Sequence, residues 1–121
     1  MLIVEDEIIV ATDLKQQLEQ MGYKVVGIVN KGKYAIKKCK ETNPDLILMD
    51  IILKGDIDGI ETVKQIQSFQ NIPIIYLTAY SDQKLFERAK ETNPVNYLIK
   101  PYDDIELNSA IRKAIKTPKV S

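Results

Sequence analysis

Polar side chains that could do chemistry together follow four short apolar runs in this sequence. They are Glu5, Asp6, Asp50, Thr78 and Lys100. An ionised carboxylate beside an apolar core is costly unless a cation or hydrogen-bond donors meet it, so Asp50 predicts a charged partner at the end of its strand. Three carboxylates, a hydroxyl and an ammonium group would then share one cleft.

Carboxylates packed this closely repel one another, and their pKa values would rise unless a cation neutralised them. Their hard oxygen atoms suit an octahedral Mg²⁺ that keeps several waters. Asp50 is the one carboxylate that would also be flanked by Lys100 and Thr78. A carboxylate can attack phosphorus and form an aspartyl phosphate, while a metal, an ammonium group and a hydroxyl stabilise the transferring group. The residues therefore predict magnesium-dependent phosphoryl transfer onto Asp50.

Each candidate also has an ordinary structural interpretation. Glu5 and Asp6 could favour a helix N-terminus through the helix dipole, and Thr78 and Lys100 could be turn residues. Asp50 is harder to explain in this way, because the four apolar residues before it predict a strand buried on both faces. The placement of all the candidates at strand ends of one sheet favours a shared site.

The elements that must position these residues alternate along the chain. Apolar runs predict strands at residues 1–4, 25–29, 45–50, 72–77 and 95–99. Helical spacing of apolar residues predicts a helix after each strand, with inward side chains that include Ala11, Leu14, Ala35, Cys39, Ile60, Val63, Leu85, Phe86, Leu107 and Ile111. We expect N-caps at Asp58, Ser81 and Asp103. The Glu-Thr-Asn-Pro segments at 41–44 and 91–94 predict helix stops.

Five β-α units in succession predict a parallel sheet with helices on both faces and right-handed crossovers. We expect one domain over residues 1–121 with an α/β, flavodoxin-like (βα)5 doubly wound fold. The expected strand order is 2-1-3-4-5, with strands one and three at the switch point. Ligands of such sheets bind beyond the carboxyl ends of the strands there, where the candidate residues lie.

Composition narrows the function. Seventeen basic and seventeen acidic residues cancel, which argues against direct nucleic-acid binding and against membrane-surface binding. No apolar run reaches the roughly 18 residues of a membrane span, and no signal peptide is visible. The single cysteine, Cys39, fits a reducing cytoplasm. The absence of histidine excludes His-based acid–base catalysis, His metal ligands and a phosphohistidine on this chain.

Five motifs together resemble the receiver domain of two-component response regulators. The motifs are Leu-Ile-Val-Glu-Asp-Glu at 2–7, Leu-Ile-Leu-Met-Asp at 46–50, Asp-Gly-Ile-Glu at 58–61, Leu-Thr-Ala at 77–79 and Tyr-Leu-Ile-Lys-Pro at 97–101. The resemblance covers essentially the whole chain. It implies a phosphoacceptor that takes a phosphoryl group from a sensor histidine kinase or a phosphotransfer protein. It also implies that the domain is not an enzyme and catalyses only its own phosphorylation and dephosphorylation.

The resemblance also implies roles for single residues. The Mg²⁺ ligands would be Glu5, Asp6, Asp50 and the backbone carbonyl of Ile52. Thr78 and Lys100 would contact the phosphoryl oxygens, and Thr78 and Tyr97 would form the switch. The Lys100–Pro101 peptide bond would be cis. A homodimer, an output domain or a partner would dock through the fourth helix, the fifth strand and the fifth helix.

The chain departs from the family pattern near the acceptor, at Ile52 and Tyr80, and before the switch aromatic, where Val95-Asn96 replaces the acidic pair of many DNA-binding relatives and argues against their dimer. Ile52 and Tyr80 are bulky where many relatives carry polar residues. With Ala79, they are the residues that we expect to modulate the site. Because neither Ile52 nor Tyr80 carries an acid or amide group to orient an attacking water, we predict a long-lived phosphorylated form.

Two other functions remain open on the same fold. An FMN-binding flavodoxin-like module is one, although Glu5-Asp6-Glu7 would repel a phosphate without a metal, and flavin absorbance would identify it. A magnesium-dependent phosphohydrolase or nuclease is the other, and steady-state turnover of a phosphate ester would identify it. The sequence also leaves open the stimulus, the kinase, the output, the oligomeric state, and whether the receiver acts alone or within a larger protein.

Overall fold

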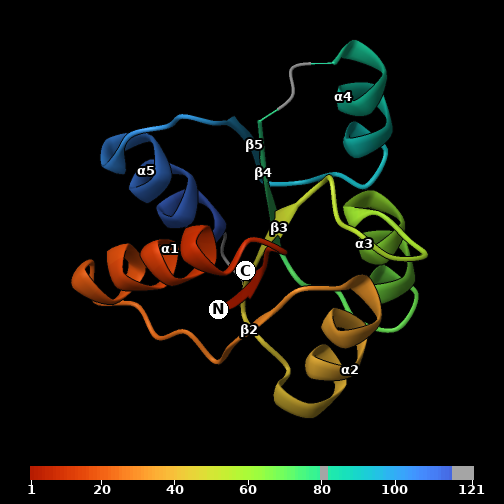
Figure 1. Ribbon diagram of the computed structural model, residues 1–121, viewed down its shortest axis with the longest axis horizontal. Helices are drawn as coiled ribbons and strands as arrows, with labels where there is room; N and C mark the ends of the chain where they lie inside the picture. The colour runs from red at the N-terminus through yellow and green to blue at the C-terminus, as the bar shows by residue number, and fades with distance from the viewer. Residues whose placement is uncertain (80–81, 116–121) are drawn as a thin grey trace, which may run out of the picture.

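A parallel sheet of five short strands forms the centre of the molecule (Figure 1). The computed structural model describes residues 1–79 and 82–115. The strands are β1 (Leu2–Val4), β2 (Gly27–Val29), β3 (Ile47–Asp50), β4 (Ile74–Thr78) and β5 (Asn96–Ile99). They pair in the order β2-β1-β3-β4-β5, and every pair is parallel. The predicted flavodoxin-like topology is confirmed.

Five helices cover the two faces of this sheet. They are α1 (Ile8–Gln20), α2 (Gly32–Thr42), α3 (Gly59–Gln67), α4 (Gln83–Lys90) and α5 (Asp104–Ile115). In Figure 1, α1 and α5 lie on one side of the sheet, and α2, α3 and α4 lie on the other. Successive strand residues point to opposite faces, so Leu2 and Val4 enter one core cluster and Ile3 enters the other. Burial on both faces explains why the strands are continuous apolar runs.

The strand boundaries and the helix caps follow from pairing and local chemistry. β2, β3 and β4 each begin two residues later than predicted, because the register pairs Leu2 with Gly27 and with Ile47, and Ile47 with Ile74. The cap at Asp58 is confirmed, since its carboxylate accepts a hydrogen bond from a backbone N–H of α3 at 2.8 Å. Among the described residues, no helix has the length and apolar character that a bilayer span requires.

Helix α4 differs from the prediction. Ser81, the expected cap, lies outside the described residues, and the side chain of Asp82 caps the helix by accepting a backbone hydrogen bond at 2.7 Å. Phe86 was expected to be buried, but it is 40% exposed. Ala89 is the fully buried residue of α4, and the Phe86 ring packs edge-on against Tyr97 with the ring centroids 5.1 Å apart. The apolar stripe of this short helix is therefore too narrow to bury Phe86.

Candidate functional site

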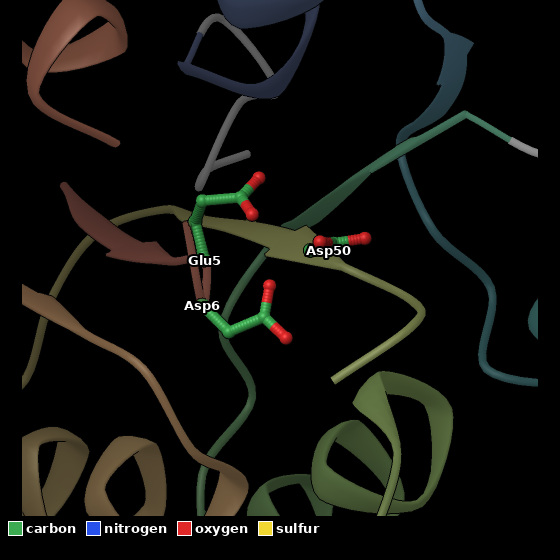
Figure 2. Close-up of side chains that lie close together, drawn as sticks. All are labelled: Glu5, Asp6 and Asp50. Atoms are coloured by element: carbon green, nitrogen blue, oxygen red, sulfur yellow. The ribbon is translucent and has the colours of Figure 1, made fainter. Parts of the chain in front are cut away.

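The carboxyl ends of β1 and β3 bring three carboxylates together (Figure 2). Glu5 and Asp6 follow β1, and Asp50 is the last residue of β3, the strand beside it. One oxygen atom from each carboxylate lies within 4.8 Å of the others. Glu5 and Asp50 are nearly buried, with exposed fractions of 4% and 8%. Parallel pairing produces this cluster, because neighbouring parallel strands end at the same edge of the sheet.

Backbone N–H groups orient all three carboxylates. The donor–acceptor pairs are Ile52 to Asp50 at 3.2 Å, Glu7 to Glu5 at 3.1 Å, and Lys54 to Asp6 at 3.3 Å. Two of these donors come from the loop after β3, so that loop lies against the ends of both strands. These bonds hold three negative charges in place without neutralising them.

Lys100 joins the cluster from β5. Its Nζ lies 2.9 Å from an oxygen of Glu5, and its backbone N–H donates to the carbonyl of Thr78 at 2.7 Å. The Lys100–Pro101 peptide bond is cis, as predicted. One ammonium group therefore lies among three carboxylates, which leaves an excess of negative charge in the cleft.

The surroundings of Asp50 disfavour its ionised form. Burial of its carboxyl group, followed by the negative charge of Glu5, raises the pKa of Asp50 from 3.8 to about 7, although Lys100 and the Ile52 N–H oppose the rise. A cation placed among the three carboxylates would relieve both the burial cost and the repulsion. Three hard oxygen ligands at one solvent-accessible edge fit Mg²⁺, which keeps waters on its open positions. The acidic cluster can therefore hold a metal ion.

Helix α3 begins directly against the backbone of Asp50, a contact that the sequence analysis missed. The N–H of Gly59 donates to the carbonyl of Ile51 at 2.8 Å, and a side chain at Gly59 would overlap the carbonyl oxygen of Asp50. Arg88 of α4 forms an ion pair with Asp58 at 3.0 Å, which ties α4 to the N-cap of α3. The glycine at the first position of α3 could have predicted the close contact with Asp50. Nothing in the sequence predicted the ion pair between Arg88 and Asp58.

Thr78 and Tyr97, the predicted switch residues, lie on neighbouring strands. Thr78 is fully buried at the carboxyl end of β4. Tyr97 on β5 contacts the ring of Phe86, and its ring centroid lies 6.1 Å from that of Tyr76. The Tyr97 hydroxyl is buried and has no hydrogen-bond partner within the described part of the chain. Burial, and then the charge of Asp82, raises the pKa of Tyr97.

The residues expected to modulate the site have different positions. Ile52 is next to the carboxylates through its backbone, and its side chain is 42% exposed. Ala79 is exposed directly after β4. Tyr80 lies outside the described residues.

Comparison with known proteins identifies the family of this chain. The sequence matches the response regulator receiver domain over residues 1–112. The chain belongs to this family. The transcriptional regulatory protein PdtaR of Mycobacterium tuberculosis is 37% identical over 114 residues, which are 94% of this chain and 55% of PdtaR. ZraR of Escherichia coli is 36% identical over 94% of this chain and 26% of its own length.

Solved structures agree with the receiver assignment. The signal receiver domain of a modulated diguanylate cyclase from Desulfovibrio desulfuricans has a TM-score of 0.91 and 41% identity, covering 98% of this chain and 94% of that one. The BeF3-activated receiver domain of Klebsiella pneumoniae RstA has a TM-score of 0.88 and 25% identity, covering 96% and 94%. This receiver spans about half or less of the curated relatives above. Membership of the family favours a signalling domain over the flavodoxin and phosphohydrolase alternatives.

Proposed function

We propose that this receiver domain, residues 1–121, accepts a phosphoryl group on Asp50 from the phosphohistidine of a histidine kinase or a phosphotransfer protein. The observation that carries the proposal is the cluster of Glu5, Asp6 and Asp50 at one sheet edge, with Lys100 beside it. A nearly buried carboxylate at the end of a central strand, in a chain of this family, is the natural acceptor. The domain would act in the cytoplasm.

In the proposed reaction, a carboxylate oxygen of Asp50 attacks phosphorus. A P–O bond forms as the P–N bond to the donor imidazole breaks, and the electron pair of that bond leaves on the imidazole nitrogen. Asp50 must be ionised to attack, and Lys100 and the N–H of Ile52 favour its ionised form. Mg²⁺, held by the three carboxylates and the carbonyl of Ile52, would neutralise charge on the transferring group.

Thr78 and Tyr97 would convert phosphorylation into a change of surface. The Thr78 hydroxyl would donate to a phosphoryl oxygen, an interaction that exists only in the phosphorylated form and therefore shifts the population. The Tyr97 hydroxyl is buried without a hydrogen-bond partner among residues 1–79 and 82–115, which supports a ring that can adopt a second packing. The affected surface would be α4, β5 and α5, where a second copy, an output domain or another partner would bind. Unchanged NMR shifts of the Tyr97 ring with a beryllofluoride mimic would refute this.

The lifetime of the phosphorylated form would depend on Ile52 and Tyr80, and Ala79 would be a further modulating residue. Loss of phosphate needs a water in line with the bond to Asp50. The partly exposed side chain of Ile52 can shield that approach and cannot orient the water.

Intact-mass spectrometry after incubation with acetyl phosphate and Mg²⁺ tests the proposal. One added phosphoryl group is expected on the unaltered protein and none on Asp50→Asn. Asp56→Asn is the matched control, because Asp56 is an exposed carboxylate in the loop that follows β3. Full labelling of Asp50→Asn, or labelling that a chelator does not reduce, would contradict the assignment.

A further inference from the structure

Six lysines and no acidic residue lie between residues 24 and 40. They are Lys24, Lys31, Lys33, Lys37, Lys38 and Lys40. All seventeen acidic residues lie elsewhere in the chain, so the formal net charge of zero is the sum of a basic segment and an acidic remainder. Helix α2 carries four of the six lysines. Positive charge is therefore gathered on one helix, and the proposed phosphoacceptor function makes no use of it.

Three lysines of α2 share one exposed side of the helix. Lys33, Lys37 and Lys40 are spaced by four and then three residues, which makes them neighbours on a helix surface, and all three are exposed. The buried residues of α2 lie on the opposite side and are Gly32, Ala35 and Cys39. Within residues 1–79 and 82–115, no lysine of α2 forms an ion pair. We call Lys33, Lys37 and Lys40 the lysine face.

The lysine face is electrostatically unfavourable for the helix that carries it. Lys33 lies in the first turn of α2, where the helix dipole disfavours positive charge, and that turn contains no acidic residue. Lys31 occupies the N-cap position, and its side chain makes no capping hydrogen bond. Lys37 repels both Lys33 and Lys40, since like charges at these spacings destabilise a helix. Departures from local rules that nothing in the described structure offsets are expected at functional sites.

Two partly exposed aromatic rings lie beside the lysine face. Tyr34 is 44% exposed, and the Nζ of Lys33 lies 5.2 Å from the centroid of its ring. Phe69, which follows α3, is 39% exposed, and the Nζ of Lys40 lies 4.9 Å from its ring centroid. Helices α2 and α3 lie side by side on the same face of the sheet (Figure 1). A segment that pairs with these lysines therefore also meets apolar surface.

We propose that the lysine face binds an acidic segment of a partner protein, whose carboxylates pair with the lysines while an apolar side chain covers Tyr34 or Phe69. Charge complementarity selects this partner. A nucleic acid or a membrane surface extends well beyond one helix and would meet the acidic remainder of the chain. An acidic segment as long as α2, about 16 Å for its 11 residues, meets the lysines alone. Such a partner leaves α4 and α5 free, because α4 lies at the other end of the sheet and α5 on its other face (Figure 1).

A peptide titration followed by NMR tests the proposal on the 1–121 chain. The probe is an acetylated and amidated peptide of the length of α2, with glutamates at helical spacing and one leucine. The control peptide has glutamine in place of each glutamate. A chelator is present, so that no metal at the acidic cluster attracts the carboxylates. We expect saturable shifts of the backbone amides of α2 and Phe69 with the glutamate peptide alone. Equal binding of the glutamine peptide, or shifts confined to other elements, would overturn the proposal.

Two matched double variants separate the lysine face from overall charge. K33Q/K37Q should weaken binding of the glutamate peptide about fivefold, since two exposed ion pairs are lost and each is weak. K84Q/K90Q removes the same charge from exposed positions of α4 and should change the affinity by less than about twofold. Both variants should fold, because glutamine and lysine have similar helix propensities. Equal weakening in the two variants would show an effect of net charge alone and contradict the proposal.

Lys33→Glu tests the electrostatic cost and the binding together. A glutamate at this position suits the helix dipole and lies four residues before Lys37, which is the favourable orientation of an ion pair on a helix. The variant should therefore raise the thermal midpoint of unfolding while it weakens binding of the glutamate peptide. A lower midpoint would refute the cost that the lysine face imposes on α2, and unchanged affinity would refute its role in binding.

Nucleic acids and membranes are the competing partners of a basic surface. The first probe is a deoxythymidine oligonucleotide with as many negative charges as the glutamate peptide. The second is a vesicle of phosphatidylcholine and phosphatidylserine, tested by co-sedimentation. We expect weaker binding of the oligonucleotide than of the peptide and no co-sedimentation with the vesicle. Tighter binding of the oligonucleotide, or co-sedimentation that K33Q/K37Q abolishes, would assign the lysine face to that partner and overturn the proposal.

Discussion

Replacing Asp50 with asparagine should stabilise the metal-free protein at alkaline pH, although it removes the proposed phosphoacceptor. Burial and the charge of Glu5 raise the pKa of Asp50 from 3.8 to about 7 in the folded state. Between these two values the folded protein holds a proton that the unfolded chain has released. The free energy of unfolding therefore falls as the pH rises from about 4 to about 7, and it stays low above pH 7.

The magnitude follows from the pKa difference. A difference of about 3 between 3.8 and about 7 corresponds to about 4 kcal/mol at about 1.36 kcal/mol per unit. This is an upper limit, because water entry and side-chain movement relieve part of the cost. We expect Asp50→Asn to raise the free energy of unfolding by about 2 kcal/mol at pH 8 and by less than about 1 kcal/mol at pH 5.

Urea denaturation at pH 8 and pH 5 in a chelator measures the effect. Asp56→Asn serves as the control, and its stability should stay within about 0.5 kcal/mol of the original at both pH values, since Asp56 is exposed. Saturating Mg²⁺ should reverse the order at pH 8, because binding to the folded state stabilises the original protein and the variant has lost one ligand. Lower stability of Asp50→Asn at pH 8 in the chelator, or an advantage that is equal at pH 5, would refute the reasoning.

Three further predictions concern the surroundings of the site. Tyr97→Phe should leave the free energy of unfolding unchanged or raise it by up to about 1 kcal/mol, because the hydroxyl is buried without a partner among the described residues. Tyr76→Phe should lower it by about 1 kcal/mol, because the variant loses a 2.7 Å hydrogen bond to Thr92. Thermal denaturation of the two variants tests this difference. Gly59→Ala should cost about 3 kcal/mol by the same measurement, because the added methyl group overlaps backbone at the end of β3; a cost below about 1 kcal/mol would contradict that contact. Ile52→Asn should speed the loss of phosphate several-fold in a chelator-quenched time course, and an unchanged rate would exclude this position from control of the lifetime.

Local patterns in the sequence determined most of the fold. Alternating strand and helix signals predicted the five units and their order, because short apolar runs and helical spacing report burial directly, and parallel connections allow few topologies. The same topology predicted that Glu5, Asp6, Asp50 and Lys100 would meet, because parallel strands end at one edge. Asp58 and the two asparagine stops were predictable for a local reason, since a cap involves residues only a few positions apart.

Contacts between distant segments were decided only by the tertiary structure. Lys100 pairs with Glu5 at 2.9 Å because of how the ends of β5 and β1 lie at the sheet edge. The ion pair of Arg88 with Asp58 and the exposure of Phe86 depend on how α4 packs against its neighbours. The hydrogen bond from Gln70 Nε2 to the side-chain oxygen of Asn43, at 3.1 Å, has the same origin, because the segments after α3 and α2 become neighbours only on folding. Sequence patterns carry the period of burial along one element, but the distance between side chains on different elements is set by packing.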